Sequence, residues 1–437
     1  MILIIVISAV PSCNTRYKGR VISGFYHDPQ GKKQAFCGYR AQNGNRILAN
    51  TMAERRYFDW NATAPLRGEA HEAVIAALGL TGNASSVHAE GRAARHLVEE
   101  AREKVANLVG AEAENVTFTS GATEANMLAL TPALEVGSRK ESRDFLFVSA
   151  IEHPSVLCGG RFPVERVELL PVRHDGLIDL DAAKRCISKA KRPLVSVMQA
   201  NNETGVIQPV RDVAEIVHAI GGVLHVDAVQ GAGRIDCTIG ELEADLLTVS
   251  SHKIGGPQGA GALIRRGEIQ ITDPLIRGGG QERGLRGGTE NVAGIAGFGA
   301  ACAAAASARQ GDAARMVALR DRFEVALKVA TPEAVVFGAN APRLPNTTMF
   351  AVPGVKAETA IIAFDLNGIA VSSGAACSSG KVQASHVLAA MGVEPMLTRG
   401  AVRVSLGWNT TESDVDALLN AWNKVVSSLL NKQANAA

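Results

Sequence analysis

Short apolar segments with the composition of β-strands recur along this chain and alternate with segments of helical periodicity. The strand-like segments span residues 116–120, 144–149, 193–198, 223–227 and 245–250, and helical patterns cover 92–110 and 210–220. Continuous apolar strands that alternate with helices are typical of a mostly parallel sheet covered on both faces. The alternation therefore predicts an α/β domain built on such a sheet.

A polar or titratable residue follows each of these strands at an equivalent position. These residues are Thr123, His153, Asn202, Asp227, Gln230 and Lys253. Ligands of open α/β sheets bind where the carboxyl ends of the strands meet, so we expect these side chains to lie close together. The sequence therefore predicts one binding site at that edge of the sheet.

Lys253 follows the strand at 245–250 and precedes the tight-loop sequence Ile254-Gly255-Gly256-Pro257. A lysine at a strand exit can form a Schiff base with an aldehyde cofactor, although a surface lysine in a loop has the same local pattern. Asp227 ends another buried strand, where an unpaired carboxylate costs several kcal/mol. The sequence thus implies a cationic partner for Asp227, which is either a structural Arg or Lys or the protonated nitrogen of a pyridine ring.

Two glycine-containing segments have the character of ligand-contacting loops. Gly121-Ala122-Thr123-Glu124 joins a strand to a helix, so its N–H groups and the positive end of the helix dipole can seat a phosphate. The same residues also fit a helix capped by Thr123 with Glu124 nearby. Residues 278–291 carry charged side chains among many glycines, which favours an ordered loop against a ligand or a second subunit over a flexible connector.

The composition describes an ordinary soluble globular protein and excludes several other classes. With 45 Lys and Arg against 43 Asp and Glu, the net charge of +2 carries no signature of binding to nucleic acid or to an anionic membrane. The seven cysteines are scattered without a C-x-x-C pair. This argues against a disulfide framework and a zinc site, and for a reducing, cytoplasmic compartment. We expect no nucleic-acid partner and no membrane.

Changes of pattern along the chain predict three segments. These are a poorly ordered N-terminal extension at 1–55, a large domain at 56–310, and a smaller α+β domain at 311–437, on which 56–67 is expected to pack. For the extension, a true start at Met52 is one interpretation, and a weak export signal at 1–10 is the alternative. The boundary near 310 lies between helical patterns at 296–308 and 316–329.

Cys377 stands in a small, polar segment, residues 372–380, that follows a predicted strand. Such a segment is typical of a loop, so we expect its thiol to be exposed, unlike the apolar-flanked Cys158 and Cys302. An exposed thiol is a chemical liability unless it is used. The segment therefore indicates a reactive cysteine, and an incidental loop cysteine is the alternative.

Taken together, the motifs resemble those of the NifS/IscS-type cysteine desulfurases of the class-V aminotransferase family. They run in family order from about residue 57 to 415: FDWNAT at 58–63, FTSGATE at 118–124, EHP at 152–154, NNETG at 201–205, HVDAVQ at 225–230, SSHK at 250–253, GGQERG at 279–284, SSGAAC at 372–377 and RVSL at 403–406. The resemblance implies the fold-type-I architecture of pyridoxal phosphate enzymes. That architecture has a large domain with a mostly parallel seven-stranded sheet and a smaller α+β C-terminal domain.

Position by position, the resemblance implies roles for individual residues. Lys253 would hold pyridoxal 5′-phosphate as a Schiff base, Asp227 would pair with the pyridinium nitrogen, and His153 would stack on the ring and move protons. The other cofactor contacts would be Asn202 and Gln230 near the ring oxygen O3′, with Ala122, Thr123, Ser250, His252 and, from the other subunit of a homodimer, Thr289 at the phosphate. Asn61 and Arg403 would bind the substrate carboxylate, for which an arginine offers a bidentate fork.

The implied reaction is the removal of sulfur from L-cysteine. Lys253 would take the Cα proton and the Cys377 thiolate would attack the substrate sulfur, which leaves a persulfide on the enzyme and L-alanine. The persulfide would pass to an acceptor, expected to be an iron–sulfur scaffold, where Cys377 is also a candidate shared metal ligand. The alternatives are a selenocysteine lyase or another class-V aminotransferase and, in a different class, a catalytically inactive scaffold or sulfur carrier.

Overall fold

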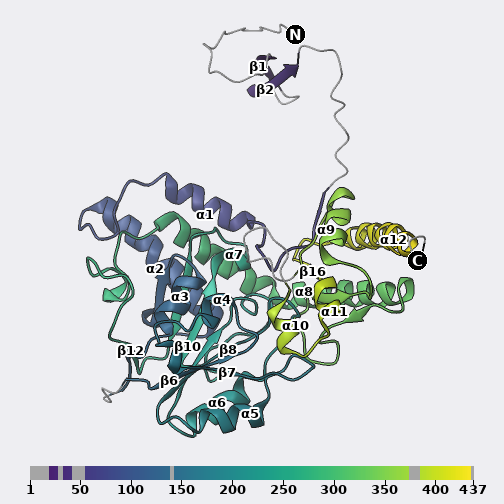
Figure 1. Cartoon of the computed structure of the whole chain (residues 1–437). Helices are drawn as coiled ribbons and strands as arrows, with labels where there is room; N and C mark the ends of the chain where they lie inside the picture. Colours follow the sequence, from purple (N-terminus) through teal and green to yellow (C-terminus); the bar gives the residue numbers. More distant parts are fainter. Residues whose placement is uncertain (1–18, 28–32, 42–54, 138–141, 374–383, 435–437) are drawn as a thin grey trace. The chain divides into compact units, whose positions relative to one another are not determined.

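The computed structural model describes residues 19–27, 33–41, 55–137, 142–373 and 384–434 of the chain. The chain divides into two units, Met1–Glu54 and Arg55–Ala437. In the first unit, β1 (Gly19–His27) and β2 (Lys33–Ala41) pair as antiparallel strands (Figure 1). These two strands are not predicted from the sequence, because glycines and mixed polarity obscure a period of two there.

A sheet of seven strands forms the centre of the second unit, in the order β4-β11-β10-β9-β8-β6-β7. Its strands are β4 (Val116–Thr119), β6 (Phe145–Ser149), β7 (Val167–Leu170), β8 (Pro193–Met198), β9 (Val223–Asp227), β10 (Leu246–Ser250) and β11 (Gly261–Arg265). Neighbouring strands are parallel except at β11, which runs antiparallel to β10 and β4. The predicted mostly parallel seven-stranded sheet is therefore confirmed, and the carboxyl ends of β4, β6, β8, β9 and β10 share one edge.

Helices cover both faces of this sheet. On β8, Leu194 belongs to the hydrophobic core of one face and Val195 to that of the other. The Val195 core includes residues of α2 (Ala89–Val109), α5 (Leu180–Ile187), α6 (Val210–His218) and α8 (Val292–Ala330), and the Leu194 core those of α3 (Ala122–Ala129) and α4 (Pro154–Leu157). Because successive strand side chains point to opposite faces, an uninterrupted apolar strand buries both of its faces.

The C-terminal part of the chain has its own sheet and core. β13 (Val335–Val336), β14 (Thr347–Ala351) and β16 (Val402–Ser405) form an antiparallel sheet, accompanied by α9 (Ala357–Leu366), α10 (His386–Ala390), α11 (Pro395–Gly400) and α12 (Glu412–Ala434). Its core is aromatic, with the ring centroid of Phe350 5.1 Å from that of Trp422 and 5.9 Å from that of Phe323. Phe58 lies in the same core, just after β3 (Arg56–Tyr57), which pairs with β15 (Ile369–Ala370). These contacts support the proposal that residues 56–67 pack on the small domain.

Helix α8 continues without interruption across residue 310. The helical patterns at 296–308 and 316–329 predict separate helices, but the structure joins them. A proline would break the helix, and α8 contains none, whereas Gly311 in its middle costs only about 1 kcal/mol relative to alanine. Ala305 lies in the core of the large domain and Met316 in that of the small one, so we propose that the domain boundary falls inside this helix.

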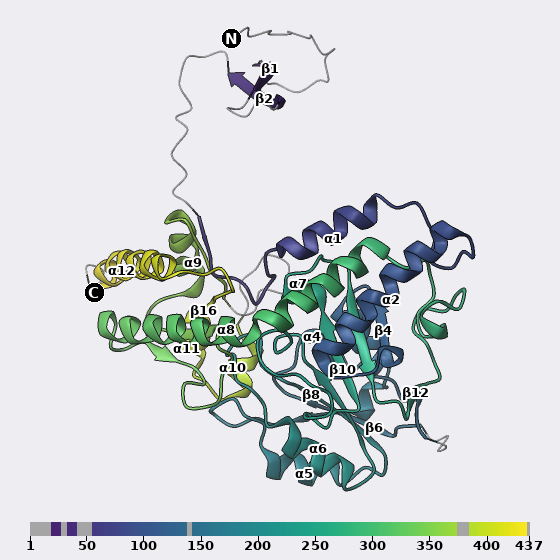
Figure 2. The ribbon, with the colours of Figure 1, turned by 180° about the vertical axis from the view of Figure 1, so that it is seen from behind.

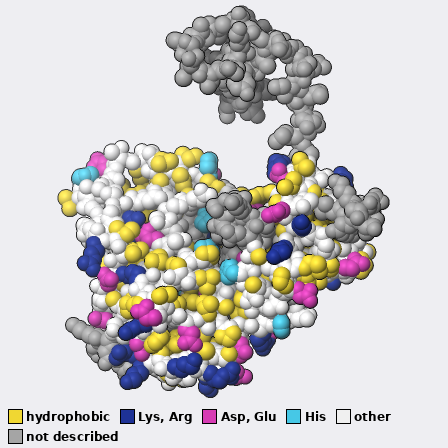
Figure 3. Space-filling model, in the orientation of Figure 1, with side chains coloured by type: hydrophobic (Ala, Val, Ile, Leu, Met, Phe, Trp, Pro, Cys, Tyr) yellow, Lys and Arg dark blue, Asp and Glu magenta, His cyan; other side chains and the backbone are white. Residues whose placement is uncertain are grey.

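Helix α8 is also the one helix of the described residues that is long and apolar enough to cross a membrane. Of its most apolar stretch, 44% is buried, and α8 packs against α1 (Gly68–Leu78) and α2, beside which it lies in Figure 2. Helix α8 is therefore a core helix. On the face of the molecule in Figure 3, basic and acidic side chains are interspersed, so that positive charge is not concentrated over it.

We expect Phe350→Ala to lower the free energy of unfolding by about 3–5 kcal/mol, because it leaves a cavity between Trp422 and Phe323. The midpoint temperature of thermal unfolding should be several degrees lower in the variant than in the wild type. The control is Val325→Ala, since Val325 on α8 is 66% exposed and its change should stay within about 0.5 kcal/mol. Equal effects of the two substitutions would contradict the assignment of this core.

Candidate active site at the carboxyl edge of the sheet

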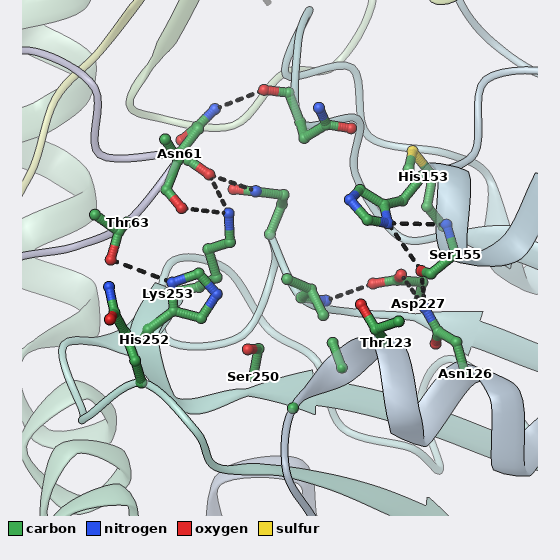
Figure 4. Close-up of a pocket in the computed structure, with 18 of the residues that line it drawn as sticks. Asn61, Thr63, Thr123, Asn126, His153, Ser155, Asp227, Ser250, His252 and Lys253 are labelled. Carbon is green, nitrogen blue, oxygen red and sulfur yellow. Dashed lines mark hydrogen bonds between the residues drawn. The ribbon is translucent and has the colours of Figure 1, made fainter. Parts of the chain in front are cut away.

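A cavity of about 500 Å³ lies where the carboxyl ends of β4, β6, β8, β9 and β10 meet (Figure 4). Most of the predicted site residues line it: Asn61, Ala122, Thr123, His153, Asn202, Asp227, Gln230, Ser250, His252, Lys253 and Arg403. Thr289 does not, and Cys377 is outside the described residues. The polar residues that follow the strands thus line one cavity, as expected: Thr123, His153, Asn202, Asp227, Gln230 and Lys253. Their roles stay predictions.

Lys253 enters the cavity from the short helix α7 (Ser251–Ile254), which directly follows β10. Its Nζ donates hydrogen bonds to the carbonyl oxygens of Asn61, at 2.5 Å, and Ala62, at 2.7 Å. Helix α7 ends at Gly255 with φ +90°, where a Cβ would lie 2.4 Å from the Trp408 ring. Glycine is therefore required at the predicted tight loop, and the loop directs the amine toward the segment at residues 61–62.

Asp227 is 5% exposed and ends β9. Its Oδ1 accepts a hydrogen bond from the Val229 N–H and its Oδ2 one from Asn126 Nδ2, each at 3.0 Å. Both donors are neutral, and no salt bridge involves Asp227 in the described part of the chain. Of the two cationic partners that the sequence leaves open, a structural Arg or Lys is thus not found there, and a cation supplied from the cavity remains.

His153 is the N-cap residue of α4, and its Nδ1 accepts a hydrogen bond from the Ser155 N–H at 3.2 Å and lies 2.8 Å from Ser155 Oγ. With Nδ1 an acceptor, the ring carries its proton on Nε2. Burial lowers the pKa of His153, aided by the charges of Lys253 and His386 and opposed by Asp227. The neighbouring Glu152 is fully buried, and burial together with the Asp227 charge raises its pKa well above the usual value. The carboxylate of Asp227 thus has neutral titratable neighbours on this side.

The start of α3 forms one wall of the cavity. Its N-cap residue is Gly121, which has no side chain to accept from the first N–H groups, so the alternative of a helix capped by Thr123 is wrong. A Cβ on Gly261 of β11 would lie 2.6 Å from the Gly121 carbonyl carbon, so the strand and the helix start can approach only without one. Uncapped N–H groups at the positive end of the helix dipole fit a phosphate.

His252 faces the same region from α7, and its Nδ1 lies 3.2 Å from Thr63 Oγ1. Burial lowers the pKa of His252 to about 4, with smaller contributions from the charges of Lys253 and Arg234. The imidazole is therefore neutral near pH 7. It can hold an anion through an N–H group but contributes no positive charge.

The predicted carboxylate-binding pair lies on the side of the cavity toward the small domain. Arg403 of β16 is 2% exposed, and it donates to Asp59 Oδ1 at 2.7 Å and to the carbonyl of Asn202 at 2.9 Å. Its Nε is buried and has no hydrogen-bond partner among the described residues. Asn61 donates to Thr347 Oγ1 at 2.9 Å and to the Asn202 carbonyl at 3.1 Å. Both side chains are thus held in place before any ligand arrives.

Several residues that contribute to the site are not predicted from the sequence. Asn126 holds Asp227 and donates to Ser155 Oγ at 3.0 Å. It could have been found, since it stands four residues after Ala122 on the same helix face. Asp59 carries no local signal for its pairing with Arg403. The expectation for Cys158 was wrong, because this residue follows the last turn of α4 and is exposed, whereas Cys302 is buried as expected.

Thr289 lines a separate cavity of about 210 Å³ in the glycine-rich segment. This cavity shares Ser120 and Gly259 with the first one, so the two adjoin. Within the glycine-rich segment, the short 3-10 helix Gln281–Gly284 carries Glu282, which pairs with the buried Arg102 at 2.7 Å. Among the described residues no group of three or more His, Cys, Asp or Glu side chains could hold a metal ion.

The chain is similar in sequence and fold to known proteins of one family. The chain matches the family Aminotransferase class-V over residues 56–418. A cysteine desulfurase of Cereibacter sphaeroides is 42% identical to it over 382 residues, 86% of this chain and 97% of that protein. The X-ray structure of a NifS-like protein from Rickettsia africae has a TM-score of 0.76 at 34% identity and covers 86% of this chain and 100% of its own. A structure of SspA in complex with cysteine has a TM-score of 0.68 at 28% identity, over 82% of this chain and 100% of its own.

His225 stands two residues before Asp227 on β9 and is buried. Its Nδ1 lies 2.8 Å from Ser196 Oγ and its Nε2 lies 2.9 Å from Thr248 Oγ1. Burial lowers its pKa to about 4, against about 6.5 in an unfolded chain. The unfolded state therefore takes up this proton first, and its contribution to stability is lost as the pH falls from about 6.5 toward 4. We expect the wild type to lose about 2 kcal/mol more than His225→Gln between pH 7 and 5, measured by urea unfolding at both values.

The control for this prediction is His218→Gln, for which we expect a pH dependence of stability of the opposite sign. The hydrogen bond that His218 Nε2 donates to Asp245 Oδ2 raises the pKa of His218, so its contribution is present at low pH and is lost as the pH rises through its folded-state pKa. His218→Gln should therefore cost more stability at pH 5 than at pH 7. An unchanged pH slope in His225→Gln would show that His225 is not held neutral by burial.

Proposed function

Because the chain belongs to the class-V aminotransferase family, we propose that it is a pyridoxal-5′-phosphate-dependent cysteine desulfurase, which converts L-cysteine to L-alanine and leaves the sulfur as a persulfide on Cys377. The observation that carries this proposal is that Lys253 and Asp227 line the same cavity. An amine suited to an aldehyde and a carboxylate suited to a protonated ring nitrogen thus face one space. The relative from Cereibacter sphaeroides is named for this activity.

The residues around the cavity fit the cofactor. The uncapped start of α3 suits its phosphate, and Asp227, with only neutral hydrogen-bond donors, lacks the cation that a pyridinium nitrogen would provide. His153, Asn202 and Gln230 line the same space and would hold the ring. When bound, the cofactor supplies an electron sink for the electron pair released at the substrate Cα.

Lys253 Nζ would move the Cα proton. The carbonyls of Asn61 and Ala62, to which it donates, stabilise the amine once it has taken that proton. The substrate carboxylate would lie against Arg403. The buried Nε–H group of this arginine has no acceptor among the described residues and would donate to the carboxylate. The side chain of Asn61 would border the same carboxylate. Cysteine is also the molecule bound in the related SspA structure.

The Cys377 thiolate would attack the substrate sulfur. An S–S bond forms between the two sulfurs, the substrate Cβ–S bond breaks with its electron pair kept by the carbon side, and protonation there yields alanine. The chain reaches this cysteine from Ser372, whose backbone exchanges hydrogen bonds of 3.1 and 2.7 Å with that of Arg403. Cys377 therefore follows, by five residues in the chain, a point anchored at the proposed carboxylate site.

We further propose a homodimer in which Thr289 of one subunit completes the phosphate site of the other. The support is that Thr289 lines a cavity adjoining the main one rather than the main one itself. The persulfide would pass to an acceptor protein, with iron–sulfur cluster assembly as the proposed destination and Cys377 as a shared ligand during transfer. The proposed compartment is the cytoplasm, in keeping with the free cysteines among the described residues, Cys158, Cys186, Cys237 and Cys302.

We expect Cys377→Ser to abolish catalytic release of sulfide and alanine from L-cysteine in the presence of a reductant, because no thiolate remains to accept the sulfur. Cofactor absorbance should be retained, since the residues proposed to hold the ring, Lys253, Asp227 and His153, are unchanged. The matched control is Cys158→Ser, which removes a cysteine that the structure shows to be exposed and should leave both products unchanged. Wild-type rates in Cys377→Ser would remove the persulfide step.

Arg403→Lys should raise the KM for L-cysteine by about tenfold or more, because lysine has no Nε–H group for the substrate carboxylate once its single ammonium group replaces the contacts with Asp59 and Asn202. The effect on kcat should be smaller, as measured by steady-state alanine formation. Arg399→Lys, the same change at an exposed position on α11, is the control and should leave KM unchanged. A KM of Arg403→Lys equal to that of the control would exclude Arg403 from substrate binding.

A further inference from the structure

Arg234 is a buried arginine that the proposed reaction does not use. It lies in the turn that follows β9, and burial lowers its pKa to about 10. Within the described residues its hydrogen bonds end only on uncharged oxygens, and it forms no salt bridge. A buried guanidinium that lacks a counter-ion is costly unless its donors are well satisfied, which points to a specific use for these contacts.

Arg234 contacts three residues in or next to the wall of the cavity: Gln230, Trp60 and Lys253. Nη1 donates to the Gln230 carbonyl at 2.9 Å and to Gln230 Oε1 at 2.5 Å. Nη2 donates to the carbonyl oxygens of Trp60 at 3.3 Å and Lys253 at 3.4 Å. One guanidinium therefore joins the turn after β9, the segment before Asn61 and helix α7.

These contacts determine which way the Gln230 amide points. Arg234 can only donate, so the amide oxygen must face it, and the Asn61 carbonyl can only accept, so the amide nitrogen must face that oxygen at 3.0 Å. The reversed orientation would set the NH₂ group against the guanidinium and one oxygen against another. Gln230 lines the cavity, so its second N–H is the group that it can offer to a ligand there.

We propose that Arg234 is a positioning residue that holds the Gln230 amide with its N–H group directed to the cofactor cavity. This inference rests on the proposed function, in which the ring oxygen O3′ lies near Gln230. A donor held toward that oxygen stabilises its deprotonated form. The pH at which the absorbance of the bound cofactor changes should therefore be lower than it would be without Arg234.

Other charged groups surround this turn and have to be separated from the effect. Lys253 and His252 face Arg234 from α7 and Arg403 from β16. Arg67 and Asp312 line, together with Arg234, a cavity of about 20 Å³. Arg67 offers a matched control, because it is also buried and donates to the Ile254 carbonyl at 3.0 Å, but it does not contact Gln230.

The experiment is a pH titration of the absorbance of the purified protein loaded with pyridoxal 5′-phosphate. Arg234→Met should move the midpoint upward by about one pH unit, a tenfold change in proton affinity. Arg234→Lys retains a donor for Gln230 Oε1, so its midpoint should lie closer to that of the wild type than to that of Arg234→Met. Arg67→Met should lower the thermal stability but shift the midpoint by less than half as much.

The double variant Arg234→Met with Gln230→Leu identifies the route of the effect. If Arg234 acts through Gln230, the double variant should have the midpoint of Gln230→Leu alone. An unchanged midpoint in Arg234→Met, or additive shifts in the double variant, would overturn the positioning role. Should Arg234→Met fail to fold, Gln230→Leu and Arg234→Lys still decide the matter, because a midpoint in Gln230→Leu equal to that of the wild type also overturns it. Failure of the proposed function would look different, since the wild type itself would then bind no cofactor or make no alanine.

Discussion

A buried carboxylate that receives hydrogen bonds only from neutral groups is the constraint on which this site depends. Asp227 accepts from the Val229 N–H and the Asn126 amide, and no ion pair reaches it within the described residues. The adjoining Glu152 follows the same constraint, because burial and the charge of Asp227 raise its pKa and favour a neutral carboxyl beside it. Uncompensated buried charge is costly. A ligand that brings a positive charge into the cavity would therefore be bound at the position where the protein most lacks one.

The segment at residues 58–61, which borders the site, contacts both domains. Phe58 packs in the aromatic core of the small domain, while three residues later the Asn61 carbonyl accepts from Lys253 and Gln230 of the large one. Arg403 extends the junction through Asp59 and the Asn202 carbonyl. A small shift between the domains would therefore alter the hydrogen bonds of the reactive amine and of the proposed carboxylate site together. This coupling gives the long helix α8, which contributes to both cores, a role in the geometry of the site.

Local sequence patterns predict much of the fold and most of the residues of the large domain that line the cavity. Lys253 and Asp227 could be placed together because parallel strands bring their carboxyl ends to one edge, which is a property of the sheet and not of the individual residues. The pairing of Asp59 with Arg403 could not be foreseen, since 344 residues separate them. Nor could the exposure of Cys158, whose apolar neighbours in sequence do not cover it in space. The antiparallel direction of β11, which lies between β4 and β10, could not be predicted for a related reason, because strand direction is decided by the chain connections and not by the composition of the strand.

The central claim is that one amine in this chain holds an aldehyde opposite Asp227. Reduction of the protein with borohydride in the presence of pyridoxal 5′-phosphate, followed by proteolysis and mass spectrometry, would locate the modified lysine. The account predicts a single pyridoxyl group on the peptide that contains Lys253, and its loss together with the visible absorbance in Lys253→Ala. Stoichiometric labelling of a different lysine, or cofactor absorbance retained in Lys253→Ala, would contradict it.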